Sequence, residues 1–276
     1  MFEQLNSRGF QVYFRCHAQA ILEVDFPDAA AEIASAISDT RMPIAEIIGS
    51  GGGETKATQR MRRAFTDLGW VKTNFEISKT VNGVIQESLS HQIDHVKSFE
   101  HGTIALEIEW NNKDPFFDRD LENFKRLHAE GAISMGVVVT RGAQLQHQLR
   151  EAVLRFAKEE AVNSLGDLKQ LGIQPTPRQR DQILKRVERD RDPVGFGEAW
   201  ADQFVADKYG AATTHWQKLM DRANRGVGNP CPLVFLGLPP SIVDFPEPVG
   251  REQAAVEIAE AAGIVAQGDE EAPDRQ

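Results

Sequence analysis

Two apolar segments that flank a helical pattern constrain the fold more than any other feature of this chain. Residues 103–110 (TIALEIEW) read as a strand, and residues 132–140 (AISMGVVVT) form the continuous apolar run typical of a parallel strand covered on both faces. Between them, residues 118–131 carry apolar positions at helical spacing and end at a glycine. This order predicts a β-α-β unit with a right-handed crossover.

An antiparallel meander is predicted before this unit. Residues 74–89 read as a hairpin, because Asn82-Gly83 is a strong signal for a two-residue turn. A separate strand is expected over residues 91–99, and Glu100-His101 forms the next turn. The sequence therefore predicts an α/β fold, a mixed β-sheet flanked by helices with an added helical region.

One main domain is predicted over residues 1–245, with a helical insert at about 161–210. Residues 246–276 read as an acidic, partly disordered tail, and removal of residues 251–276 is expected to leave activity intact. No apolar run is long enough to span a membrane and the N-terminus lacks the pattern of a signal peptide, which favours a cytoplasmic protein without a membrane partner.

The net charge of −10 would by itself argue against a nucleic-acid partner. However, nine acidic residues and only two arginines lie from residue 244 onward, so residues 1–243 carry a net charge of only −3. A body that is only mildly acidic is compatible with a local basic face that binds DNA.

Three carboxylates are predicted to converge on one point of the sheet. If Glu100-His101 is a two-residue loop, Asp94 lies opposite Glu107 on the neighbouring strand. Glu109 shares the face of Glu107, because side chains alternate along a strand. Carboxylates this close cannot all stay ionised without a cation, and oxygen ligands of this kind suit Mg²⁺.

These residues resemble the core of a known nuclease superfamily. The order Asp94, Glu107 and Glu109 on adjacent strands, before a helix and a strand, resembles the PD-(D/E)xK nuclease motif. The segment QIDHVKSFEHGTIALEIEWNNKDPFFDRDLENF is similar to the BglII/BstYI family of type II restriction endonucleases. VVVTRG (137–142) and KYGAATTHWQKL (208–219) also resemble members of that family.

The resemblance implies a restriction-endonuclease-like fold and a Mg²⁺-dependent, site-specific deoxyribonuclease with Asp94, Glu107 and Glu109 as catalytic residues. It makes Asp94 and Glu107 the metal ligands, with the carbonyl of Ile108 as a third. Ile93 stands where the general motif has proline, and Glu109 stands where it has lysine. The role of Glu109 therefore stays open between metal ligand and base for the attacking water.

Two segments are candidates for contacts with double-stranded DNA. Asparagine can pair with adenine in the major groove, and the family uses positions just after the second motif acid, which favours Asn112 and also Asn111. Lys113 is a candidate to approach the scissile phosphate. A second group of polar side chains can reach phosphates or base edges: Thr213, Thr214 and His215. A turn at the asparagines and a helix cap at the threonines are the structural alternatives.

The expected partner besides DNA is a second copy of the chain, because a palindromic site matches a homodimer that cuts one strand with each subunit. The resemblance implies a site with a GATC core cut to leave a 5′ overhang. A cognate DNA methyltransferase, as in a restriction-modification system, is the expected genetic partner.

Other functions stay open beside this one. The chain can be another PD-(D/E)xK nuclease of repair or recombination, or a non-catalytic DNA-binding protein. A phosphate-loop interpretation of residues 49–56 fails, because the spacing GxxxxGK[ST] is absent. A zinc site at His91, His95 and His101 has no cysteine beside it.

Overall fold

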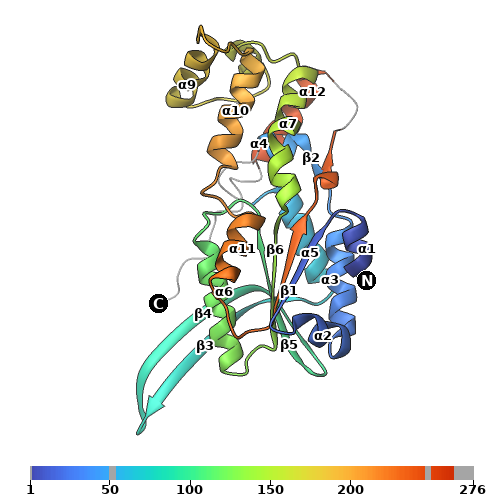
Figure 1. The fold of residues 1–276 in the computed structure, drawn as a ribbon, viewed down its shortest axis with the longest axis vertical. Coiled ribbons are helices and arrows are strands. Elements are labelled where there is room, and N and C mark those ends of the chain that lie inside the picture. Colours follow the sequence, from blue (N-terminus) through green and yellow to red (C-terminus); the bar gives the residue numbers. More distant parts are fainter. Residues whose placement is uncertain (1, 50–53, 246–249, 264–276) are drawn as a thin grey trace. The chain divides into compact units, whose positions relative to one another are not determined.

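The computed structural model describes residues 2–49, 54–245 and 250–263 (Figure 1). The chain divides into two compact units. We call the first the sheet unit; it comprises Met1–Asp39, Met61–Ala143 and Thr214–Pro239. We call the second the helical unit; it comprises Thr40–Arg60, Gln144–Thr213 and Pro240–Gln276. The predicted insert at 161–210 falls within the helical unit, and the proposed domain boundary at residue 245 stays a prediction.

The sheet unit is built on a six-stranded sheet in the order β1-β7-β6-β5-β4-β3. Strands β5, β6 and β7 are parallel, and the remaining pairs are antiparallel. The mixed α/β fold predicted from the sequence is therefore confirmed. The strands are β1 (Gln11–Arg15), β3 (Val71–Val81), β4 (Val84–Phe99), β5 (Gly102–Glu109), β6 (Met135–Arg141) and β7 (Leu233–Leu238).

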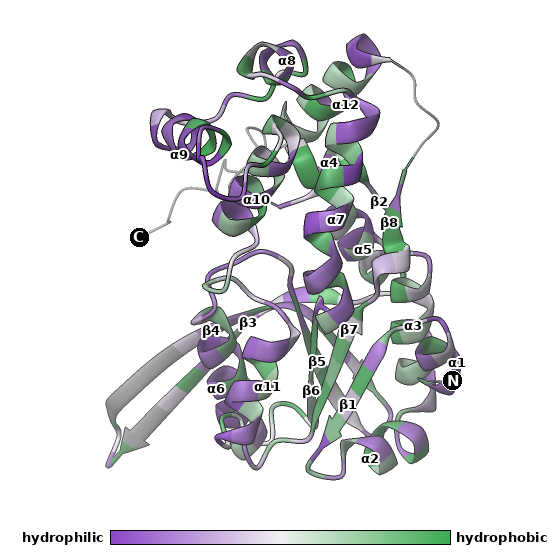
Figure 2. Cartoon of the chain, turned by 45° about the horizontal axis from the view of Figure 1, so that its top comes forward, coloured by the Kyte–Doolittle hydropathy of each residue, from purple (hydrophilic) through white to green (hydrophobic). Residues whose placement is uncertain are grey.

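Helix α6 (Phe116–Ala129) connects β5 to the parallel strand β6, which confirms the β-α-β unit. Every residue of β6 and β7 is buried, as expected for parallel strands with both faces covered. Figure 2 shows these central strands as largely hydrophobic. The β-α-β unit therefore places the carboxyl ends of β5 and β6 side by side in a buried part of the sheet.

The antiparallel part of the sheet differs from the prediction in one respect. The turn at Asn82-Gly83 is present, with φ values of 52° and 81° in the left-handed region. Strand β4 then continues without a break from Val84 to Phe99, so the expected division into a hairpin strand and a separate strand at 91–99 is wrong. No proline or glycine occurs between Val84 and Phe99, and nothing in that stretch ends the strand.

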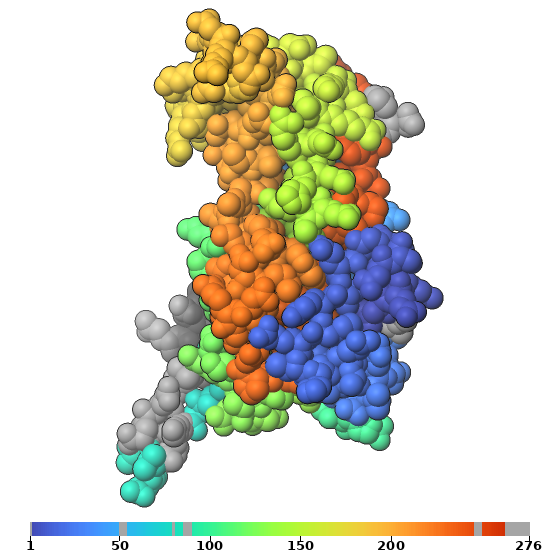
Figure 3. Space-filling view, in the orientation of Figure 1, coloured from blue at the N-terminus to red at the C-terminus, as the bar shows by residue number. Residues whose placement is uncertain are grey.

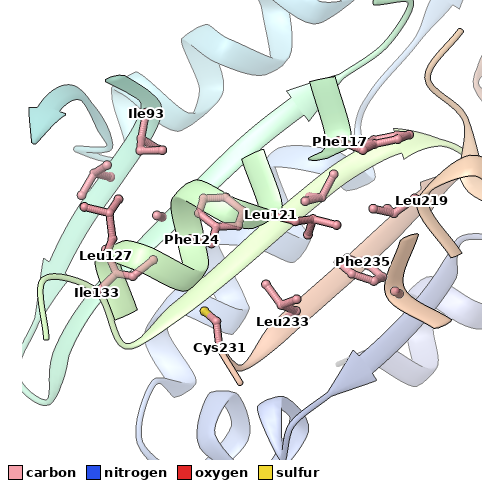
Figure 4. Packing of buried hydrophobic residues seen from close by; sticks show 14 residues of the cluster. Ile93, Phe117, Leu121, Phe124, Leu127, Ile133, Leu219, Cys231, Leu233 and Phe235 are labelled. Atoms are coloured by element: carbon pink, nitrogen blue, oxygen red, sulfur yellow. The ribbon is translucent and has the colours of Figure 1, made fainter. Parts of the chain in front are cut away.

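One face of the sheet is covered by α6 and α11 (Trp216–Asn224). Figure 4 shows the apolar side of α6, with Phe117, Leu121 and Phe124, packed with Leu233 and Phe235 of β7. All five side chains are fully buried, and truncation of a core phenylalanine costs about 3–5 kcal/mol. This packing fixes α6 against the strands that carry the candidate carboxylates.

The other face is covered by α3 (Pro27–Ser38) and by α5 (Lys56–Asp67). The Trp70 indole donates to Glu32 at 2.8 Å, and the rings of Phe65 and Trp70 meet edge to face. The N-terminal α1 (Phe2–Ser7) and α2 (Ala18–Val24) flank β1, which pairs with β7. Figure 3 shows these N-terminal residues in blue beside the orange segment that includes α11.

The helical unit contains most of the remaining helices and a small two-stranded sheet. Thr176 begins α9 with a capping box that includes Gln179, so the local sequence defines this helix start. Its elements are α4 (Ile44–Gly49), α7 (Ala143–Glu159), α8 (Leu165–Gln170), α9 (Pro177–Val187), α10 (Phe196–Lys208) and α12 (Arg251–Gly263), with β2 (Met42–Pro43) and β8 (Val243–Asp244).

Helix α12 packs against α4 and does not extend into solvent as a tail. Ile258 and Ala261 of α12 are buried, and a Cβ added at Gly49 of α4 would lie 2.6 Å from the Ile258 carbonyl oxygen. Arg251 donates to the Glu160 and Ala161 carbonyls. Residues 246–249 and 264–276 of the predicted acidic, partly disordered tail lie outside the described residues.

Removal of residues 251–276 is expected to destabilise the helical unit, contrary to the expectation from composition. The truncation uncovers the apolar surface of α4 and removes the hydrogen bonds of Arg251 to the Glu160 and Ala161 carbonyls. A thermal melt should show a lower Tm for this truncation than for the full chain. Equal melting of the two proteins would contradict the packing of α12 on α4.

Among the described residues, no helix combines the length and the apolar character needed to cross a membrane.

Candidate active site

The candidate site lies where the parallel strands end. Glu107 and Glu109 close β5 and pair in register with Val138 and Thr140 of β6. The Thr140 hydroxyl donates to the Glu109 carbonyl at 2.7 Å, which fixes the end of β5 against β6. In open α/β sheets ligands bind beyond the carboxyl ends of the strands, and these two acids stand there.

Asp94 lies on β4 beside Glu107. The register of β4 and β5 runs from Phe99–Gly102 to His95–Leu106, as the two-residue turn predicts, and Asp94 is the next residue of β4, where its charge acts on Glu107. Between Val71 and Thr73 the pairing of β3 with β4 shifts, so that Lys72 faces two residues of β4, Asp94 and His95. Such a bulge re-aims side chains, and bulges are frequent next to active sites.

Two basic side chains contact the Asp94 carboxylate. Arg62 of α5 lies 3.8 Å from Asp94 and Lys72 of β3 lies 3.5 Å from it. Both basic side chains are about half exposed, and the carboxylate is one-third exposed. Ion pairs of this kind contribute about 1 kcal/mol or less, so a competing ligand can displace them at small cost.

Burial dominates the electrostatics of the two glutamates. Glu107 and Glu109 are only 5% and 3% exposed. Burial raises the pKa of Glu107 well above its usual range, and the charges of Asp120, Asp94 and Glu109 raise it further. Burial also raises the pKa of Glu109 to about 9, with a further contribution from Asp120, while Asn112 and Arg119 oppose the shift.

Asp120 is a fourth carboxyl group of the site, and the sequence analysis missed it. It lies in the second turn of α6 and is 1% exposed. Its Oδ1 accepts from Arg119 at 2.9 Å, but its buried Oδ2 has no donor as long as the neighbouring carboxyls are ionised. A proton shared with Glu109 supplies that donor, in line with the raised pKa of Glu109. Helical spacing from Phe117 and Phe124 could have revealed this inward position.

Arg119 partly offsets the negative charge of this cluster. Its guanidinium lies 2.8 Å from Asp120 and 3.8 Å from Glu109, and it also stacks over the ring of Phe116 with its central carbon 4.3 Å from the ring centroid. Arg119 faces three buried carboxyls, Glu107, Glu109 and Asp120, so these three keep an excess of negative charge or hold protons in its place.

The donor set fits a hard divalent cation in its chemistry. Buried carboxyl oxygens that repel one another, with one oxygen lacking a donor, are relieved when a cation replaces their protons. Among the described residues, however, no three Asp, Glu, His or Cys side chains are arranged as a ready metal site. Asp94 faces Arg62 and Lys72 here, so it must turn toward Glu107 to join a cation there.

Two of the three histidines considered for zinc, His91 and His95, are buried. His95 is 2% exposed, its ring packs against Phe65 at 5.3 Å, and its Nδ1 lies 3.3 Å from the Leu106 carbonyl. Burial lowers the pKa of His95 to about 4, so it stays neutral near pH 7. His91 is also buried, while His101 is exposed at a turn. Residues 50–53 of the glycine-rich segment lie outside the described residues.

Of the residues predicted to contact DNA, three follow β5 directly in the β5–α6 loop, residues 110–115. Asn112 and Lys113 are exposed, and Asn111 is half-buried. The Asn112 side chain donates to Glu109 at 2.8 Å, so the candidate base reader touches the candidate catalytic residue. The structure therefore brings Asp94, Glu107, Glu109 and Asn112 together, and Ile108 lies between the two glutamates.

The other predicted contacts lie after α10. Thr214 is fully buried, and His215 is 9% exposed with a pKa lowered to about 4, chiefly by burial. Thr213 belongs to the helical unit, where its hydroxyl donates to the Gly210 carbonyl at 2.8 Å. Direct contact of these three residues with DNA stays a prediction.

Comparison with known proteins identifies the family of the chain. The family model described as restriction endonuclease BglII/BglIII matches residues 10–238, which is most of the chain. The chain belongs to the restriction endonuclease BglII/BglIII family. This membership confirms the family resemblance and the fold class predicted from the sequence, and it supports the activity of a nuclease on double-stranded DNA. No curated protein matched the chain significantly.

Proposed function

We propose that the chain is a type II restriction endonuclease that hydrolyses phosphodiester bonds of double-stranded DNA at one short palindromic site, with Mg²⁺ as its cofactor. The observation that carries this proposal is the buried carboxyl cluster at the end of β5, next to exposed Asn112, in a chain of the BglII/BglIII family. Family membership by itself supports a nuclease activity. The buried carboxyl cluster supports the dependence of that activity on a metal ion.

In this proposal the residues at the end of β5 and on β4 have two roles. Asp94 and Glu107, with the Ile108 carbonyl, hold the cation, and Glu109 accepts a proton from the attacking water. Bound Mg²⁺ supplies charge that stabilises the developing phosphate oxyanion and lowers the pKa of bound water. Glu109 serves as a base only when ionised, so its raised pKa requires that positive charge nearby.

Arg119 and Asp120 support this arrangement from α6. Arg119 contacts the carboxylates of both Asp120 and Glu109, and so it orients the Glu109 side chain. Lys113, which is exposed beside Asn112, approaches the scissile phosphate as a positive charge. Asn111 and Asn112 contact base edges, and Thr213, Thr214 and His215 are the second predicted group of DNA contacts.

The finer features of the proposal follow from the family. The active form is a homodimer whose two subunits cut opposite strands. The site has a GATC core, the cut leaves a 5′ overhang, and a cognate DNA methyltransferase in the same restriction-modification system protects the host.

A digest of plasmid DNA of known sequence tests the activity. Discrete fragments in the presence of Mg²⁺ are the expected result. A smear would favour another PD-(D/E)xK nuclease of repair or recombination. Binding to DNA without cleavage in either Mg²⁺ or Mn²⁺ would favour a non-catalytic DNA-binding protein.

Substitution of Asn112 with alanine is expected to relax site selection. A side chain that pairs with a base edge discriminates against wrong bases by about 1–3 kcal/mol, so cleavage of sites with one changed base pair should rise roughly tenfold or more relative to the preferred site. Competitive digestion of the two DNA sequences measures this ratio.

Asn163→Ala is the matched control, because Asn163 is an exposed asparagine of the helical unit. It should keep the wild-type ratio. An unchanged ratio in Asn112→Ala would remove Asn112 from the residues that read the DNA sequence.

A further inference from the structure

The β5–α6 loop is bridged to a segment that lies about a hundred residues later in the chain. The Thr214 backbone N–H donates to the Asn112 carbonyl at 2.8 Å. In the opposite direction, the Asn112 backbone N–H donates to the Thr214 hydroxyl at 3.1 Å. Two hydrogen bonds of opposite sense hold the backbone of Asn112 at this point.

Thr214 is itself held by hydrogen bonds from a buried arginine. Arg141, the last residue of β6, is fully buried, and its Nε and Nη2 donate to the Thr214 carbonyl at 3.2 and 2.6 Å. Its guanidinium also lies 5.6 Å from the centre of the Trp110 ring, at the start of the same loop. Two hydrogen bonds from one buried guanidinium to the same carbonyl restrict the position of Thr214.

The far end of the loop is held by the helix that follows Thr214. Asp114 lies 3.2 Å from Lys218 and 3.3 Å from Arg222, both on α11. Asn112 and Lys113 are exposed. The loop is therefore anchored at Asn112 and at Asp114, on either side of Lys113.

The anchored asparagine also reaches the candidate catalytic centre. Its side-chain Nδ2 donates to Glu109 Oε2 at 2.8 Å. A backbone shift at Asn112 therefore displaces a side chain that has two functions. This side chain would pair with a base, and it also donates a hydrogen bond to Glu109. Functional groups of this kind must be held within about 0.5 Å of their working geometry.

We propose that Thr214, fixed by Arg141, is a positioning residue for Asn112, so that the choice of DNA sequence depends on a buried threonine that does not itself contact DNA. This inference rests on the proposed function for its effect on cleavage, although the bridge itself can be tested without DNA. It replaces the direct DNA contact expected of Thr214 with an indirect role.

The test compares Thr214→Val with Thr214→Ser. Valine keeps the volume of threonine but cannot accept the Asn112 N–H, whereas serine keeps the hydroxyl. The first measurement is hydrogen exchange of residues 110–115 in the DNA-free protein. The second is the ratio of cleavage at the preferred site to cleavage at sites with one changed base pair, in Mg²⁺.

In Thr214→Val the Asn112 amide hydrogen should exchange at least about tenfold faster than in wild type. The ratio of cleavage at the preferred site to cleavage at altered sites should fall roughly tenfold to a hundredfold, the range expected for one base contact. Thr214→Ser should retain both properties. Thr103→Val, at a partly exposed threonine of β5, is the control for loss of a hydroxyl and should match wild type.

Three results would overturn the proposal. The first is wild-type discrimination in Thr214→Val, and the second is equal loss in the serine and valine variants. The third is fast exchange of the Asn112 amide in the wild-type protein, which decides the question even if the valine variant fails to fold. If the wild type cuts no DNA, the proposed function fails, and the exchange measurement still judges the bridge.

Discussion

Glu107→Gln is expected to abolish DNA cleavage while the protein still binds DNA. Glutamine keeps the shape of the side chain but removes the charge with which Glu107 would hold the cation. Loss of several kcal/mol of charge stabilisation lowers the rate roughly a thousandfold or more, because each 1.4 kcal/mol is about tenfold. Cleavage is measured with Mg²⁺ and binding with Ca²⁺, and Asp94→Ala should behave in the same way.

The matched control for this variant is Glu100→Gln, an exposed glutamate in the turn between β4 and β5. It should cut DNA at the wild-type rate. Glu107→Gln should also melt at a higher temperature than wild type without divalent ions, because glutamine is neutral, whereas burial and the neighbouring charges disfavour the ionised Glu107 carboxylate. Retained cleavage by Glu107→Gln would exclude the metal-site assignment.

The stability of the DNA-free protein without divalent ions should fall as the pH rises from about 4.5 to about 9, through the Glu109 carboxyl. The unfolded chain loses the Glu109 proton near its ordinary pKa, while the folded protein keeps it up to a pKa of about 9. In this window the folded state binds more protons than the unfolded state, so a higher pH favours unfolding. Glu107 and Asp120 act in the same direction, since their pKa values are also raised.

Thermal melts with a chelator, at about pH 6.5 and about pH 8.5, measure this effect. One retained proton corresponds to about 1.4 kcal/mol per pH unit, so the Tm of wild type should fall roughly 5–10 °C more than that of Glu109→Gln. Glu100→Gln should follow wild type. The same pH dependence in wild type and Glu109→Gln would show that Glu109 carries no such proton.

Mg²⁺ is expected to restore stability mainly at the higher pH. A cation competes with protons for the same carboxyl oxygens, so it binds best where the carboxyls have lost their protons. The gain in Tm on adding Mg²⁺ should therefore be larger at about pH 8.5 than at about pH 6.5, and it should be small in Glu107→Gln.

Much of the sheet could be predicted from local sequence. Continuous apolar runs identified the parallel strands, and two-residue turns fixed the antiparallel register that brings Asp94 beside Glu107. The bulge opposite Lys72 could not be predicted, because it depends on how β3 pairs with β4 along their whole length. That bulge decides which basic side chains meet Asp94.

The site itself was only partly predictable. Three of its four carboxyls follow from the strand pattern, and the fourth, Asp120, follows from helical spacing once the start of α6 is known. The burial of Thr214 depends on contacts with Asn112 and Arg141, which are distant in the sequence, and no local pattern reveals it. The same is true of α12, whose composition suggested a tail, whereas Gly49 lets it pack closely on α4.

Sequencing of the fragment ends tests the central claim most directly. DNA of known sequence is digested by the wild-type protein in Mg²⁺, with Glu107→Gln as the parallel reaction. We predict that all wild-type ends share one short palindromic sequence with a 5′ extension, and that the variant produces no ends. Ends without a common sequence, or equal cutting by wild type and Glu107→Gln, would contradict the account.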